Sequence, residues 1–169
     1  MRRILAILGT ALALGACATA QRLDAANDVH TLLTAIRDDD VRAFEAHVDR
    51  PALQREIEAR MARELGQAKA DNSLKLLGAL LAPTVAKVAG DALIQPSTFR
   101  MVAANYGYRP SQPLPGRVVI ASALKPLDDG RVCAVSKKDG PCLLIFTKEG
   151  QTWRLSGFEG DLKQLRRGG

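Results

Sequence analysis

The hydrophobic pattern of this chain changes near Asn105, and that change constrains the fold more than any other feature. Before it, apolar residues recur at the spacing of helix faces; after it, short apolar runs alternate with glycine-containing turns. A helical half followed by an antiparallel half predicts an α+β domain in which the helices pack on one face of a sheet. With 169 residues, 47% of them hydrophobic, the chain has enough apolar material for one such domain.

The helical part covers residues 23–105 and is expected to hold about five helices. The apolar face of the first helix is formed by Ala25, Val29, Leu32, Leu33 and Ile36. Asp40 suits the cap of a second helix, and Pro51 suits the first turn of a third. The residues expected to face inward from these two helices are Val41, Phe44, Val48, Leu53, Ile57, Met61 and Leu65.

A further segment, Leu74 to Ile94, is rich in leucine, alanine and valine and is interrupted by Pro83. A buried helical hairpin and a helix lying in the membrane interface both fit this composition; the charged residues within the segment favour the hairpin. Pro96 and Ser97 then open a short helix.

The sheet is expected within residues 117–159, because four strand-like runs follow a proline-rich connection. The runs are 117–124, 131–136, 142–147 and 152–158. The turns between them contain Gly130, Gly140 and Gly150, which supply the positive φ that tight hairpins need. Four strands joined by short turns predict an antiparallel meander.

The N-terminus has the layout of a secretory signal over residues 1–16. Arg2 and Arg3 precede an almost uninterrupted apolar run, which is shorter than the ~20 residues that a transmembrane helix needs. The sequence Leu14-Gly15-Ala16-Cys17 that follows resembles the bacterial lipobox.

This resemblance implies that the signal is removed before Cys17 and that the new N-terminal cysteine receives acyl chains. Residues 17–22 would then be a lipid-anchored linker and residues 23–169 the folded domain. Because Ala18 replaces the aspartate that retains lipoproteins in the inner membrane, the expected location is the periplasmic face of the outer membrane. An ordinary secreted protein with a chance cysteine near its cleavage site is the alternative.

The segment AIRDDDVRAFEAHVDRPAL, residues 35–53, resembles a bacterial family known as domain of unknown function 2939, and the likeness extends to Trp153-Arg154-Leu155. The family has no assigned activity, so none is implied here. The chain also has a looser similarity, at the level of the fold, to the nuclear-transport-factor-two superfamily, whose helices lean on a curved sheet to form a cone. This chain differs from a simple cone because it has extra helical segments between about Leu53 and Ile94.

Cys133 and Cys142 flank the turn between two of the expected strands. A register that pairs Cys133 with Leu144, and Val135 with Cys142, puts both sulfur atoms on one face of the sheet, as diagonal neighbours. An oxidising compartment permits a disulfide between them, whereas diagonal spacing is long for one. The sequence is therefore compatible both with a disulfide between Cys133 and Cys142 and with two buried thiols.

His47 and Asp49 are candidates for acid and base catalysis, because a carboxylate close to an imidazole can orient it for proton transfer. The alternative is a helix end in which Asp49 accepts backbone N–H bonds. Asp38, Asp39 and Asp40 fit a solvated capping turn better than a calcium loop, and neither a metal nor a cofactor is expected.

Cleavage of the signal lowers the formal net charge from +6 to +4, and the basic residues do not gather with aromatic ones, so nucleic-acid binding is not expected. No phosphate-binding loop, nucleophile elbow or zinc motif occurs. We therefore expect a non-catalytic envelope module that binds a protein or a small apolar ligand. A hydrolase- or isomerase-like enzyme with a cone-type pocket is the alternative.

Overall fold

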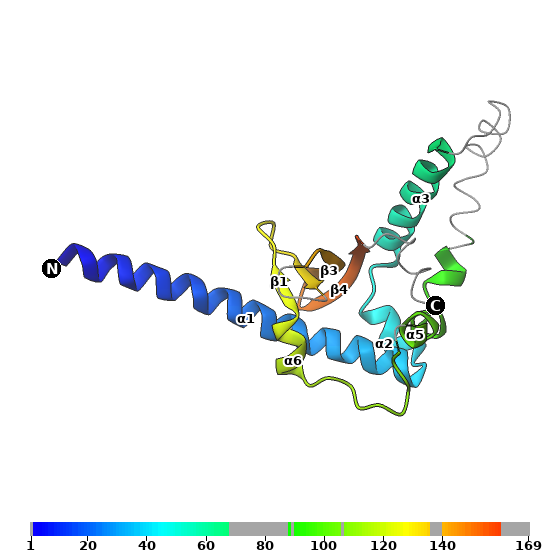
Figure 1. The fold of residues 1–169 in the computed structure, drawn as a ribbon, viewed down its shortest axis with the longest axis horizontal. Coiled ribbons are helices and arrows are strands. Elements are labelled where there is room, and N and C mark those ends of the chain that lie inside the picture. Colours follow the sequence, from blue (N-terminus) through cyan, green and yellow to red (C-terminus); the bar gives the residue numbers. More distant parts are fainter. Residues whose placement is uncertain (1, 68–87, 89, 106, 136–139, 160–169) are drawn as a thin grey trace.

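A computed structural model of the chain describes residues 2–67, 88, 90–105, 107–135 and 140–159. Its longest element is helix α1, Arg2–Asp38, which runs along the molecule and carries the other elements near its C-terminal half (Figure 1). The N-terminal end of α1 projects away from the rest of the chain (Figure 1). From Ala25 to Ile36 the helix buries one apolar face, as its spacing predicts.

The helices with defined bounds that follow α1 in the described residues are α2 (Val41–Ala46), α3 (Arg50–Gln67), α5 (Pro96–Asn105) and α6 (Arg117–Ser122). Asp40 caps α2 by accepting a hydrogen bond from the backbone N–H of Ala43 at 3.0 Å. Pro51 lies in the first turn of α3, where its missing N–H costs no helical hydrogen bond. The second, third and Pro96-led helices of the sequence prediction are therefore confirmed.

The sheet is a four-stranded antiparallel meander with the order β1-β2-β3-β4. Its strands are β1 (Leu124–Pro126), β2 (Val132–Val135), β3 (Cys142–Glu149) and β4 (Thr152–Phe158). Gly130 and Gly150 adopt positive φ in the turns that precede β2 and β4. The helices pack against this sheet, so the α+β layout is confirmed.

The core forms where α1 meets the inner face of the sheet and the short helices around it. Phe44 packs edge-on against Phe99 of α5, with the ring centroids 5.4 Å apart. Val48, which follows α2, forms a parallel bridge with Leu155 and so covers the free edge of β4. The early helical segment and the last strand are therefore parts of one core.

The run 117–124 was expected to be a strand, and this expectation is wrong for most of its length. Residues 117–122 form helix α6, and only Leu124 belongs to β1. The run is rich in β-branched residues, but Ile120 and Ala121 are buried in the shared core while Val118 and Val119 are exposed. Packing against α1 has therefore overridden the local preference for strand.

Three smaller expectations also need correction. Helix α1 includes residues 17–22, which were expected to precede the first helix. Val41 is exposed rather than inward-facing. Cys133 pairs with Ile145 instead of Leu144, because an irregularity between Ala134 and Val135 shifts the register.

Most of the Leu74–Ile94 segment, including Pro83, lies outside the described residues.

Candidate functional site

The candidate lipidation site, Cys17, lies within α1, and its side chain is outside the described part of the structure. One helical turn later, the Gln21 side chain donates a hydrogen bond to the carbonyl oxygen of Gly130, at 2.9 Å. The turn between β1 and β2 therefore reaches back to α1 within four residues of Cys17. A helix, and not an extended linker, connects this cysteine to the folded body.

His47 lies between α2 and α3, and both of its ring nitrogens face protein oxygen atoms. Nδ1 donates to the carbonyl oxygen of Ala43 at 2.8 Å, and Nε2 lies 3.5 Å from Oδ1 of Asp28 on α1. The imidazole side chain is only 14% exposed. This arrangement holds the end of α2 against α1.

Asp49 does not pair with His47; it has a structural role at the start of α3. Its Oδ1 accepts the backbone N–H of Ala52 at 3.0 Å, which caps the helix. Its backbone N–H donates to the carbonyl oxygen of Leu155, whose own N–H donates to the carbonyl of His47, both at 2.9 Å. The carboxylate that faces the imidazole is that of Asp28, for which the sequence pattern gives no signal.

Asp24 and Asp28, one turn apart on α1, together hold the beginning of β4. Oδ2 of Asp28 accepts the backbone N–H of Trp153 at 2.8 Å, and Oδ2 of Asp24 accepts its indole N–H at 2.9 Å. The ammonium of Lys148 also donates to Asp24, at 2.7 Å. These bonds from Lys148 and Trp153 hold the pKa of the Asp24 carboxyl below its usual value. Trp153 is buried, so its indole is a core group anchored by a carboxylate.

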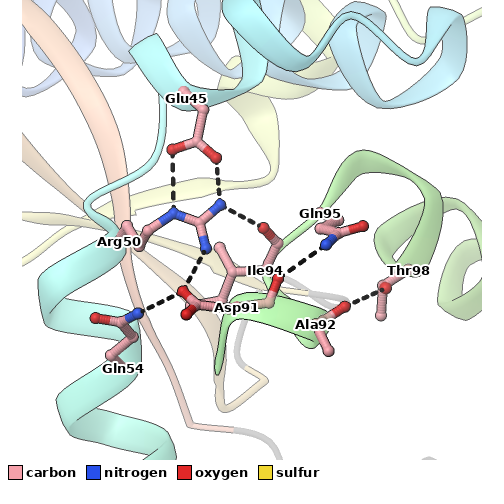
Figure 2. Close-up of polar contacts among 8 residues, drawn as sticks. All are labelled: Glu45, Arg50, Gln54, Asp91, Ala92, Ile94, Gln95 and Thr98. Atoms are coloured by element: carbon pink, nitrogen blue, oxygen red, sulfur yellow. Dashed lines mark hydrogen bonds and ion pairs between the residues drawn. The ribbon is translucent and has the colours of Figure 1, made fainter. Parts of the chain in front are cut away.

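Arg50 forms the second polar cluster, shown in Figure 2. Its guanidinium binds both carboxylate oxygens of Glu45, donates to the carbonyl oxygen of Ile94 at 2.7 Å and lies 3.6 Å from Asp91. Gln54 also donates to Asp91, at 3.1 Å. The cluster ties the start of α3 to residues 90–95, and Glu45 raises the pKa of Arg50. The contacts of Arg50 therefore indicate a structural role.

A disulfide joins Cys133 and Cys142, whose Cα atoms are 5.5 Å apart. This spacing lies within the usual range for a relaxed bridge. Val135 pairs with Cys142, as expected, while the register irregularity changes the partner of Cys133. Cys133 is fully buried.

Asp38, Asp39 and Asp40 are exposed at the end of α1, where Asp39 adopts positive φ and Asp40 caps α2. Within the described ranges, no group of three histidine, cysteine or acidic residues could hold a metal ion. Among the same residues, no helix is both long and apolar enough to cross a membrane.

The family model for a protein of unknown function, DUF2939, matches residues 8–102, more than half of the chain. The chain belongs to this family. The DUF2939 match runs from α1 into α5 and ends before the sheet, so Trp153 lies outside it. Neither the curated proteins nor the solved structures give a match. The similarity to the nuclear-transport-factor-two cone therefore stays a prediction.

Proposed function

We propose that this DUF2939 protein is a lipid-anchored, non-catalytic binding module of the bacterial envelope. Leu14-Gly15-Ala16-Cys17, placed after a basic start and a short apolar run, is the observation that carries the proposal. Acyl chains on Cys17 would hold the mature protein on a bilayer, since several chains together bind firmly where one binds reversibly. Ala18 supports placement at the periplasmic face of the outer membrane.

The surroundings of His47 and Asp49 support a binding role over an enzymatic one. General acid or base catalysis requires a side chain within hydrogen-bond reach of a substrate proton. His47 is engaged by Ala43 and Asp28, and Asp49 caps α3, so both side chains already serve the fold. We accordingly give neither residue a catalytic function.

The partner surface that we propose lies at the end of α1 that is far from Cys17. There α2 and α5 come together through the contact of Phe44 with Phe99, and Arg100 lies 3.4 Å from Asp39. Val41 on α2 and Met101 on α5 are exposed apolar residues at this end, and Met101 is 67% exposed. Exposed apolar side chains beside charged ones suit an envelope protein or a small apolar ligand as the partner.

Replacement of the anchor residue tests the proposal. Wild type should incorporate labelled palmitate, be processed to a shorter form and fractionate with membranes, whereas Cys17→Ala should lose all three properties. Cys142→Ala is the matched control, because it also removes a cysteine but lies outside the lipobox. Unchanged processing, labelling and fractionation of Cys17→Ala would refute the anchoring proposal.

The binding role needs its own measurement. A photo-crosslinker at position 101 should capture a defined envelope component, and the same group at the exposed position 55 on α3 provides the comparison. Equal capture from both positions would refute a partner surface on α5.

A further inference from the structure

We propose that the exposed face of α6 rests on the bilayer surface, so that α1 lies along the membrane instead of standing upright on it. The inference rests on the proposed lipid anchor at Cys17 and adds an orientation to it. The occupant we assign to this face is the phospholipid surface.

The first argument is the short distance between the anchor and α6. Helix α1 is continuous from Cys17 into the packed region, and Ala25 is already fully buried. Eight residues of α-helix advance the chain by only ~12 Å. Gln21 already contacts the turn that follows β1, and α6 leads directly into β1. In Figure 1, α6 crosses α1 nearer to the N-terminus than α2 and α5 do.

The second argument is the composition of the α6 surface. Ile120 and Ala121 are buried in the core, so the opposite side of the helix is left outward. That side carries Val118, which is 75% exposed, and Val119, which is 59% exposed. Exposure of two adjacent valines to water is unfavourable. Their transfer to the boundary between headgroups and acyl chains lowers the free energy.

The third argument is charge. Arg117 precedes the two valines and Lys125 follows in β1; both are exposed, and neither forms an ion pair within the described residues. Exposed cations close in sequence to exposed apolar side chains favour a surface that contains anionic phospholipids. An anchored protein is held within reach of that surface, so even a small apolar contact suffices to set its orientation.

Orientation decides whether the contact can form. A helix standing upright on the bilayer would raise α6 about 12 Å above the anchored residue. When α1 lies along the bilayer, α6 and the anchor reach the same surface. The apolar residues of α2 and α5, at the far end of α1, are not part of this contact.

The test uses the full-length lipidated protein in vesicles of phosphatidylethanolamine and phosphatidylglycerol, prepared with and without brominated acyl chains. An environment-sensitive fluorophore is attached at Val118→Cys or, as the matched control, at Met101→Cys. Each variant has one reactive thiol, because Cys133 and Cys142 are bonded and Cys17 carries the lipid. We expect a blue-shifted emission, quenched by brominated lipid and shielded from aqueous iodide, at position 118 and not at 101.

The outcomes separate this inference from the anchoring proposal. Protein that incorporates palmitate and stays with the vesicles, but whose label at 118 behaves like that at 101, would overturn the docking of α6 alone. Shielding from iodide without quenching by brominated chains would assign the face to a protein contact and overturn the lipid assignment. Failure to incorporate palmitate would overturn both proposals. The double variant Val118→Asp with Val119→Asp should remain anchored, and a label at position 122 should then become more accessible to iodide than in the parent.

Discussion

Asp28 on α1 accepts a hydrogen bond from the backbone N–H of Trp153 on β4, across 125 residues of sequence. The same carboxylate faces the imidazole of His47. One acidic side chain therefore joins the first helix, the segment after α2 and the last strand. His47 and Asp49 both belong to this junction, since Asp49 bonds to Leu155 on the same strand.

Replacement of Asp28 by alanine should lower the free energy of unfolding by about 1.5 to 3 kcal/mol, because a charged acceptor is lost and the N–H of Trp153 is left unpaired. Urea denaturation followed by circular dichroism measures the change. Asn27→Ala changes an exposed neighbour on the same helix and should alter stability by no more than ~0.5 kcal/mol. Equal effects of the two variants would contradict this role for Asp28.

Arg50→Lys should weaken the junction between α3 and residues 90–95. The planar guanidinium binds two carboxylate oxygens and a carbonyl oxygen at once, and an ammonium group cannot reproduce this geometry. We expect a loss of about 1 to 2 kcal/mol in unfolding free energy. Faster amide hydrogen exchange at Ile94, which bonds to the carbonyl of Gly90, should accompany it. Arg55→Lys, on the exposed side of α3, is the control. An unchanged exchange rate at Ile94 in Arg50→Lys would contradict the prediction.

Removal of the disulfide by Cys133→Ala with Cys142→Ala should destabilise the protein by about 2 to 3 kcal/mol, as expected for a loop closed over nine residues of separation. Reduction of the wild type should lower the denaturation midpoint in the same direction and leave the double variant unaffected. A reductant that shifts both proteins equally would show that the bridge is not the source of the effect.

The ion pair between Asp24 and Lys148 should make stability depend on acidic pH. Because the pKa of Asp24 is lowered in the folded state, its ionised form stabilises the fold at neutral pH. This contribution is complete above the unfolded pKa of about 4 and is lost as the pH falls through the folded pKa. Both side chains are more than a third exposed, so the effect should stay below ~1 kcal/mol.

The measurement for Asp24 compares wild type with Asp24→Asn by denaturation over a range of pH. The stability difference between them should be largest near neutrality and shrink below about pH 4. A difference that stays constant down to acidic pH would rule out a role for the Asp24 charge.

Ala18→Asp should move the proposed lipoprotein from the outer to the inner membrane without reducing palmitate incorporation, because it introduces the retention residue next to Cys17. Separation of the two membranes on a density gradient measures the shift. Ala18→Ser is the control and should remain in the outer membrane. Identical distributions of both variants would contradict sorting by this position.

Local features of the fold were predictable where the deciding residues lie within one helical turn of each other. The cap formed by Asp40 and the position of Pro51 depend only on nearby backbone groups, and both predictions are correct. Helical spacing did not distinguish Val41 from Phe44, because tertiary packing leaves Val41 exposed and buries Phe44 in the shared core, where it contacts Phe99.

Features set by distant residues could not be predicted. The valines of α6 favour a strand locally, and contact with α1, about 90 residues earlier, makes the segment helical. No local sequence pattern marks Asp28 as the partner of His47. The other contact of Asp28 is a backbone N–H on the last strand, and a backbone group leaves no trace in the sequence. The carboxylate nearest to His47 in sequence, Asp49, instead caps the following helix.

The bridge between Val48 and Leu155 and the bonds from α1 to Trp153 have a consequence for biogenesis. The core of the N-terminal helices remains incomplete until β4, near the C-terminus, has been synthesised. Contacts over such sequence separations form late and slow the search for the native state. The complete native core therefore cannot form on a nascent chain before β4 has been synthesised, a property that is compatible with the export we propose.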